Sequence, residues 1–470
     1  MQILDMCIQP NEVIKLFTIN ALDKKNMTPA LGLIEACDLI KNQKLAVADF
    51  LSQCTERANM SEPTLKAFTQ RVPLADLISE SGAGPLMGIP VAVKDIIATK
   101  DLVTTNGSPI YEGHLPKEDA AIVRKIQKLG GVVFGKTVST EFAWRHPGLT
   151  TNPWNSEHTP GGSSSGSAAA VASGIVPLAI GSQTVGSIVR PAAFCGVVGF
   201  KASFGAIPRE GAHPVSSSLD HIGFFTRSVD DAVYAFNLLK NIEISEDEAI
   251  VLRDAAVSPI REFLGARMPH IALLRTPFDH LLSAEQVDAI KLASDLLISS
   301  GAKIEELTLP QSYWDGIDAL HILMACEASI VHKDHFENSA ELLSIHIKDL
   351  VAKGNSYSAS QYITARNLQK ELRKSIGQYF EKYDAFLSAP APGEAPKGLD
   401  FTGDPIFCAL WSFLGTPSIA LPLTKSSHGL PLGIQLIGNY RDDEKLLNIA
   451  KFAEESFQKN LSARSAANPL

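Results

Sequence analysis

The stretch 161–190 constrains the fold of this chain more than any other part of the sequence. Two turns rich in serine and glycine, 161–167 and 181–187, bracket a helix of small residues at 168–172 and an apolar run at 175–180. Small residues let neighbouring backbones approach one another closely. Upstream, Lys94 ends a short apolar segment that is expected to form a strand. The pattern predicts a tightly packed core in which serine-bearing turns lie beside a single lysine.

These residue types suggest a nucleophile and a base other than the serine–histidine pair. A serine hydroxyl attacks well only after a base removes its proton. A lysine can be that base only when neutral, which requires burial or hydrogen-bond donors that lower its pKa. Glycine-rich turns let several backbone N–H groups point at a developing oxyanion. Two other interpretations remain open: the serines as ordinary turn residues, and Lys94 as the ion-pair partner of Asp95.

Composition sets the limits for this interpretation. With 470 residues, of which 45% are hydrophobic and 20% charged, the chain can bury a large core. The net charge of −9 argues against broad binding to phosphate groups. Six scattered cysteines without a CxxC pair indicate free thiols in a reducing compartment. We found no signal peptide and no apolar run of 18 residues, so the expected location is the cytoplasm, without a membrane partner.

The order of periodic segments predicts an α/β fold. Residues 1–75 are expected to form a helical region packed on the core, 76–460 the catalytic domain, and 461–470 a frayed end. Strands expected at 87–93 and 132–134 flank a helix at 119–129, which indicates a sheet covered by helices. The region 311–382 is expected to be mostly helical, with only scattered residues of catalytic type. Further helices are expected at 228–239, 284–300 and 443–457, and further strands at 270–275, 303–307, 418–422 and 432–437.

Three familiar motifs fail on context. Residues 130–137 match the phosphate-binding loop pattern, but a helix precedes them and apolar residues fill the loop positions. Residues 162–166 match the GxSxG elbow without the strand that should lead into it. Three histidines, His146, His158 and His221, lack the spacing of metal ligands, so no metal is expected.

Several longer segments resemble the amidase signature family. They are GIPVAVKD (88–95), GKTVSTEFA (135–143), TNPWN (151–155), TPGGSSSGSAAAVASG (159–174), GSQTVGSIVRPAAFCGVVGFK (181–201), SSLDHIG (217–223) and GLPLGIQLIG (429–438). The similarity runs from about residue 35 to residue 455. Such an extended match is far more specific than any of the short motifs above.

The resemblance implies a fold and a set of roles. The fold is a single large mixed sheet with helices on both faces. The catalytic set implied is Lys94 as base, Ser163 as a bridging serine that follows a cis peptide bond, and Ser187 as nucleophile. The backbone N–H groups of Thr184, Val185, Gly186 and Ser187 are expected to form the oxyanion hole. Gly161, Gly162 and His221 are expected to contact substrate, and no cofactor is implied.

The second turn departs from the family pattern GSDTGGSIR in three places. Asp is replaced by Gln183, a glycine by Val185, and Arg by Val189, with Arg190 following. We hypothesise that the family's Asp and Arg pair behind the oxyanion loop, and that both charges have been removed together here. The competing hypothesis is that Arg190 takes over the role of the family's arginine.

Two functions from different classes follow from the resemblance. The first is a stand-alone hydrolase of small amides, anilides or carbamates, with a small-molecule amide and water as its partners and no nucleic acid. The alternative is the amidase-like subunit of a tRNA-dependent amidotransferase, which passes ammonia within a multi-subunit assembly. The departures at the second turn and the lack of a basic face favour the first. A homodimer remains open, and an inactive scaffold is disfavoured because all three catalytic positions are filled.

Overall fold

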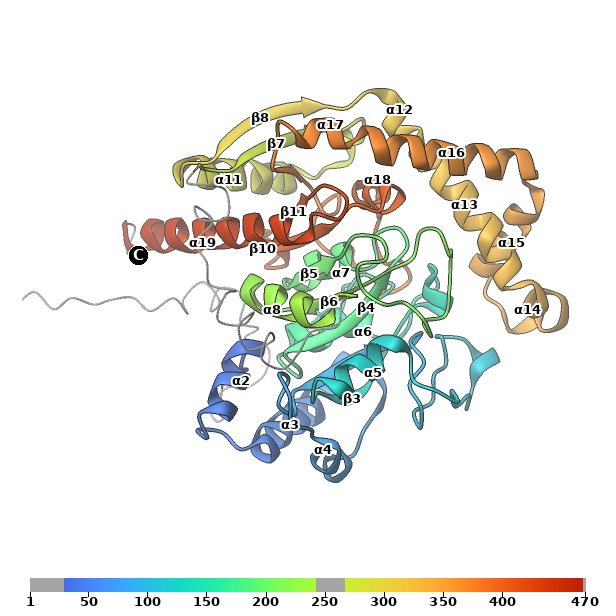
Figure 1. The fold of residues 1–470 in the computed structure, drawn as a ribbon, viewed down its shortest axis with the longest axis vertical. Coiled ribbons are helices and arrows are strands. Elements are labelled where there is room, and N and C mark those ends of the chain that lie inside the picture. Colours follow the sequence, from blue (N-terminus) through green and yellow to red (C-terminus); the bar gives the residue numbers. More distant parts are fainter. Residues whose placement is uncertain (1–28, 242–266, 468–470) are drawn as a thin grey trace, which may run out of the picture.

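The computed structural model of the chain describes residues 29–241 and 267–467 (Figure 1). These residues form a single mixed sheet with helices packed on it, as the α/β prediction required. The side chains of residues 460–467 are not described. The predicted boundary near residue 75 stays a prediction, and much of the region before it, residues 1–28, lies outside the described residues.

The sheet has eleven strands among the described residues. In spatial order they are β1 (Phe68–Arg71), β3 (Val132–Thr137), β2 (Pro90–Lys94), β4 (Leu178–Gln183), β6 (His221–Thr226), β5 (Val198–Lys201), β10 (Ser418–Lys425), β11 (Pro431–Ile437), β9 (Ala385–Ser388), β7 (His270–Arg275) and β8 (Lys303–Thr308). Strand β2 lies parallel to both β3 and β4, whereas the central strands from β4 to β9 pair antiparallel. Strands β9, β7 and β8 are parallel again.

The helices form layers on this sheet and an arm beside it (Figure 1). Helices α6 and α7 pack on each other and on central strands, while α8, α11 and α19 form a second packed group. Helices α13 to α16 extend away from the sheet on the right of Figure 1. The α-helices are α2 (Leu33–Lys41), α3 (Val47–Leu65), α4 (Leu74–Glu80), α5 (Ala121–Lys128), α6 (Ser165–Ala172), α7 (Val189–Cys195), α8 (Val229–Leu239), α11 (Ala284–Ser299), α12 (Gln311–Trp314), α13 (Gly316–Val331), α14 (Lys333–Asn338), α15 (Ile345–Ser356), α16 (Ala359–Ser375), α17 (Gly377–Phe380), α18 (Ile406–Leu414) and α19 (Asp443–Ala467).

Apolar patterning located helices α5, α8, α11 and α19 and strands β2, β3, β7, β8, β10 and β11, because it reports which face is buried. Helix α8 begins after Ser228, whose side chain accepts a hydrogen bond from the Asp231 amide, as an N-cap serine does. Residues 135–137 of the rejected phosphate-loop motif are buried within β3, so they form no loop. Among the described helices, none combines the length and the apolar character needed to cross a membrane.

The two serine-rich turns are shorter than the sequence suggests. Helix α6 begins at Ser165, so its first turn includes serines that were expected in the preceding loop. Strand β4 continues through Gln183, which leaves 184–188 as the second turn. Buried hydrogen bonds explain both extensions: the Ser165 hydroxyl donates to the Gly161 carbonyl, and the Ser167 hydroxyl donates to the Ile180 carbonyl. Because these hydroxyls donate to backbone carbonyls within regular structure, the serines do not favour a loop here.

Candidate active site

Lys94 ends strand β2 and is completely buried. Its Nζ lies 2.6 Å from Ser163 Oγ and 2.8 Å from Ser182 Oγ. Burial lowers the pKa of Lys94 well below its ordinary value, because the ammonium loses its hydration, and the negative charge of Asp220 opposes this shift only in part. No carboxylate of the described residues forms an ion pair with it. Burial therefore favours the neutral form of the Lys94 amine, which is the form that can act as a base.

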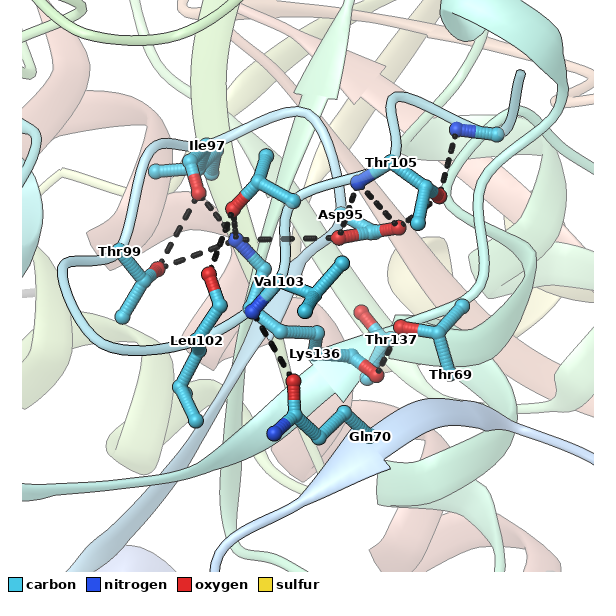
Figure 2. A network of polar contacts seen from close by, with 12 residues as sticks. Thr69, Gln70, Asp95, Ile97, Thr99, Leu102, Val103, Thr105, Lys136 and Thr137 are labelled. Atoms are coloured by element: carbon cyan, nitrogen blue, oxygen red, sulfur yellow. Dashed lines mark hydrogen bonds and ion pairs between the residues drawn. The ribbon is translucent and has the colours of Figure 1, made fainter. Parts of the chain in front are cut away.

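Asp95 is occupied elsewhere, which removes one of the alternative interpretations. Its carboxylate lies 3.8 Å from the Nζ of Lys136 and accepts hydrogen bonds from the hydroxyl and amide of Thr105. Figure 2 shows the Lys136 amine among Asp95, the Ile97 carbonyl and the Thr99 hydroxyl. Burial lowers the pKa of Lys136 to about 8. This second lysine holds the loop that follows β2 and pairs with Asp95. The hydrogen-bond partners of the Lys94 amine are therefore Ser163 and Ser182.

Ser163 follows a peptide bond that is cis in this structure, as the resemblance implied. The carbonyl of Gly162, on the other side of that bond, accepts a hydrogen bond of 2.7 Å from Arg190 Nη2. The carbonyl of Ser163 accepts one of 3.2 Å from the Thr140 amide. The segment that carries Ser163 is thus held on both sides of the cis bond.

Ser187 and the loop before it are almost completely buried. Ser187 is 8% exposed, and its hydroxyl makes no hydrogen bond within the described part of the chain. The backbone N–H groups of Thr184, Val185, Gly186 and Ser187 likewise meet no acceptor there. Buried or half-buried N–H groups are rarely left without a partner. Backbone N–H groups without an acceptor, next to a serine hydroxyl, are the kind of donors that stabilise an oxyanion in acyl transfer.

Gln183 takes part in shaping that loop from behind. Its side-chain oxygen accepts from the amides of Ile188 at 2.8 Å and Val189 at 3.0 Å. Its side-chain nitrogen donates to the Val185 carbonyl at 3.2 Å and to Ser412 Oγ at 3.0 Å. A neutral amide therefore ties both ends of the loop together, without an ionic partner.

Arg190 is not the partner of position 183. Its Nη2 donates to Gly162 and, at 3.2 Å, to Thr402 Oγ1, and no hydrogen bond joins it to Gln183. Burial lowers the pKa of Arg190 to about 10. The structure gives no support to the hypothesis that Arg190 replaced the family's arginine in a pair with position 183. Val189, which stands where that arginine is found, is fully buried.

A cavity of about 410 Å³ lies beside the loop 184–187. Ser182, Thr184, Asp220 and His221 are among the residues that line it. His221 is buried on β6, with Nδ1 3.2 Å from the Gln183 carbonyl. Gly161 and Gly162 do not line this cavity. The substrate contacts of all three predicted residues stay predictions.

Gly161 has a conformational role that only glycine can fill. Its φ is +81°, and a Cβ there would lie 2.8 Å from Pro191 Cα. The remaining two histidines lie apart from the site chemistry: His158 Nδ1 lies 2.8 Å from the Ala395 carbonyl, and the ring of exposed His146 faces that of His346. Among the described residues, no group of three or more His, Cys, Asp or Glu could hold a metal ion.

Three polar residues of this site were not singled out from the sequence. Ser182 contacts Lys94 directly. Asp220 accepts a hydrogen bond of 2.6 Å from Thr184 Oγ1. Glu327, on helix α13, accepts from the hydroxyl of Ser216 at 2.6 Å and so holds the turn that leads to Asp220. SSLDHIG was a signal for Asp220, but nothing in the sequence around Glu327 connects it to a site more than a hundred residues away.

Comparison with curated proteins gives relatives along most of the chain. One of them, a subunit of glutamyl-tRNA(Gln) amidotransferase from Synechococcus sp. (strain CC9605), is 31% identical, over 95% of this chain and 99% of the relative. The protein of the same name from Halothermothrix orenii is 30% identical, over 91% and 97%. Among solved structures, the same subunit of the Thermotoga maritima amidotransferase superposes with a TM-score of 0.73 at 28% identity, over 92% of this chain and 95% of that one.

These relatives correct the leading functional expectation. A stand-alone hydrolase of small amides is wrong on this comparison, because the curated relatives are named as one subunit of an amidotransferase. The expected partners are wrong on the same ground: the relatives are named for a tRNA, whereas we expected a small amide and water without nucleic acid. Three substitutions in one turn had favoured the hydrolase, but similarity along the whole chain carries more weight.

The family itself is established by a match that spans most of the chain. The mixed sheet superposes on a solved structure described as a crystal structure of an amidase with a TM-score of 0.79 at 27% identity, over 91% of this chain and 100% of that one. A family model described as Amidase matches residues 50–447. The chain belongs to the amidase family, hydrolases that act on carbon–nitrogen bonds.

Proposed function

We propose that this chain is the amidase subunit of a tRNA-dependent amidotransferase. In this role it hydrolyses a primary amide, and partner subunits use the released ammonia to amidate glutamyl-tRNA(Gln). The observation that carries the proposal is the coverage of curated relatives of that name: the relatives from Synechococcus and Halothermothrix orenii match more than nine tenths of both chains at about 30% identity. The cytoplasmic location stays a prediction.

The proposed chemistry assigns one role to each predicted catalytic residue. Ser187 Oγ attacks the amide carbon, its proton passes to Ser163 Oγ, and the Ser163 proton passes to the neutral amine of Lys94. The distance of 2.6 Å from Lys94 Nζ to Ser163 Oγ supports the second transfer. When the C–N bond breaks, Lys94 returns the proton through Ser163 to the leaving nitrogen. The products of this half-reaction are ammonia and a Ser187 acyl-enzyme.

The second half-reaction uses the same groups. A water molecule gives its proton to the relay and attacks the acyl carbon, which releases the carboxylic acid and restores Ser187. In both halves the oxyanion is proposed to accept hydrogen bonds from the amides of 184–187, which have no acceptor among the described residues. Losing one such donor typically slows an enzyme by about 10²–10³-fold.

An assembly test separates ammonia production from ammonia use. The tagged chain is purified from its own cells together with its partners, and conversion of Glu-tRNA(Gln) to Gln-tRNA(Gln) is followed with ATP and glutamine as a probe amide. We expect Ser187→Ala to abolish conversion with the amide as nitrogen donor but to retain it with ammonium chloride, because added ammonia bypasses the amidase step.

Two outcomes would reject the proposal. The first is an assembly that fails to amidate the tRNA with either nitrogen source, while the purified chain is active alone on amides. The second is full amide-dependent conversion by the Ser187→Ala assembly, which would remove Ser187 from the chemistry. Ser167→Ala is the matched control, since it deletes a buried hydroxyl of helix α6 that has no proposed catalytic role.

A further inference from the structure

Ser182 makes a contact that the proton relay from Ser187 to Lys94 does not require. Its Oγ lies 2.8 Å from Lys94 Nζ, nearly as close as Ser163 Oγ at 2.6 Å. Ser182 belongs to β4, which pairs directly with β2, so the contact is fixed by the sheet. A buried lysine amine therefore contacts two hydroxyl groups that come from different elements.

The geometry of a neutral amine makes these two hydroxyls unequal. A neutral Lys94 has two N–H donors and one lone pair. To receive the proton of Ser163, the lone pair must point at Ser163 Oγ. An acceptor that binds one N–H on another side of the nitrogen stops the amine from rotating and holds the lone pair in that direction. Ser182 Oγ is such an acceptor.

We propose that Ser182 is a positioning residue, which orients the Lys94 amine so that its lone pair faces Ser163. The inference rests on the proposed role of Lys94 as base. Ser182 also lies between Lys94 and the 410 Å³ cavity, which it lines together with Asp220. Neither Ser163 nor Ser187 lines that cavity, so Ser182 separates the base from this space.

The charged surroundings of Lys94 leave Ser182 as the contact that can be changed most cleanly. Strand β4 and helix α6 bring no charged side chain to the lysine. On β3, Lys136 pairs with Asp95, the residue after Lys94. Asp220 is the acidic group whose charge acts on Lys94, and it raises the lysine's pKa. His221, on β6, is buried, and burial keeps its pKa well below the ordinary value, so it stays neutral.

The test measures the pH dependence of Ser187 phosphonylation, in which the serine oxygen attacks the phosphorus of a fluorophosphonate and fluoride leaves, and it needs no knowledge of the substrate. A fluorophosphonate probe labels the full-length protein, and the labelling rate is recorded from pH 5 to pH 10 for the wild type, Ser182→Ala and Ser182→Thr. A hydrogen bond to a cation is stronger than one to a neutral amine. Loss of the Ser182 acceptor therefore lowers the pKa of Lys94. The rising limb of the plot of labelling rate against pH moves to lower pH as a result.

For Ser182→Ala we expect a plateau rate lower by about ten- to a hundredfold and a limb shifted by about one pH unit to lower pH. Ser182→Thr keeps the hydroxyl and should keep the limb of the wild type. Ser167→Ala, which loses buried hydrogen bonds to β3 and β4 without contact to Lys94, should keep both limb and plateau.

Either of two results overturns the inference. One is a Ser182→Ala variant with the plateau and limb of the wild type. The other is a lower plateau with an unmoved limb, which would mean that Ser182 acts only through packing. Failure of the base assignment gives a different result: a Lys94→Ala variant that labels like the wild type, whatever Ser182 does.

Discussion

Replacement of Gln183 by methionine should destabilise the protein and slow the reaction of Ser187 with a fluorophosphonate. Gln183 is 1% exposed and lies behind the oxyanion loop. Methionine has a similar length and fills the same space, but it can neither accept nor donate a hydrogen bond of ordinary strength. The change therefore removes polar contacts with little change in packing.

The magnitude follows from the groups that are left without partners. The amides of Ile188 and Val189 lose their acceptor, since both bind the Gln183 oxygen. The Val185 carbonyl keeps a donor, because the Ser412 hydroxyl also binds it at 2.6 Å. Each buried N–H left unsatisfied costs about 1–3 kcal/mol, so the loss of the acceptor for two of them should lower the free energy of unfolding by about 2–6 kcal/mol.

Urea denaturation followed by fluorescence measures this loss, with fluorophosphonate labelling as the functional readout. The matched control is Gln286→Met, another buried glutamine, whose side chain donates to the Gly433 carbonyl far from the site. The control should lose stability without any change in labelling rate. A Gln183→Met protein within about 0.5 kcal/mol of the wild type would refute the reasoning, because that is the range of ordinary surface substitutions.

Two further predictions concern charge at the same site. The labelling rate of Ser187 should rise with pH and level off well below pH 10.5, since burial lowers the pKa of Lys94. In Lys94→Ala the labelling rate should fall by about 10²–10⁴-fold and no longer rise with pH. A Lys94→Ala variant with the same pH-dependent rise would contradict the assignment of Lys94 as base. Gln183→Asp and Val189→Arg should each destabilise by about 3–5 kcal/mol, because each buries an unpaired charge, whereas the double variant should recover part of the loss. A double-mutant cycle from urea denaturation measures the coupling, and strictly additive effects would reject a pairing between these positions.

Short sequence patterns predicted the parts of the site whose conformation depends on neighbouring residues in the chain. Lys94 at the end of an apolar strand, the glycine at position 161 and the two serine turns are all visible in short stretches of sequence. The extents of the turns were less predictable, because serines that usually favour loops here have partners inside α6 and β4: the Ser165 hydroxyl donates to the Gly161 carbonyl, and the Ser182 hydroxyl accepts from Lys94. Hydroxyl groups change their structural preference with tertiary partners, which a single sequence does not display.

Contacts across long separations could not be predicted in the same way. Glu327 lies in a helical region whose catalytic-type residues looked scattered, yet it binds Ser216 and the Ser218 amide of the turn before β6. The Tyr362 hydroxyl, from α16, donates to the same carboxylate. Glu327 therefore helps to join the helical arm to the wall of the site, together with Gln369 of α16, whose side chain donates to the Ser218 carbonyl. The function could not be predicted from the site alone either. Similarity to the curated relatives along the whole chain outweighed the three substitutions near Ser187 that had favoured a stand-alone hydrolase.

The last prediction concerns Asp220, whose carboxylate joins the oxyanion loop to the neighbouring turn. It accepts from Thr184 Oγ1 at 2.6 Å and from the amides of Val215 and Ser216, both at 2.9 Å. Burial nevertheless raises the pKa of Asp220 to about 6, from an ordinary value of 3.8, so desolvation outweighs these hydrogen bonds. Below pH 3.8 the carboxyl is protonated in both the folded and the unfolded state. Between pH 3.8 and about 6 the unfolded chain loses this proton first, and the folded state becomes relatively less stable.

A shift of about 2 units corresponds to about 3 kcal/mol of unfolding free energy, lost by the wild type as the pH rises through this window. Asp220→Asn has no such titration. Its stability relative to the wild type should therefore improve by about 3 kcal/mol between about pH 4 and pH 7, even if the amide fits the three donors less well at every pH. Urea denaturation of both proteins at several pH values measures the difference. A difference that stays constant across this range, or that changes in the opposite direction, would mean that the hydrogen bonds to Asp220 outweigh its burial, and that this carboxylate is ionised throughout.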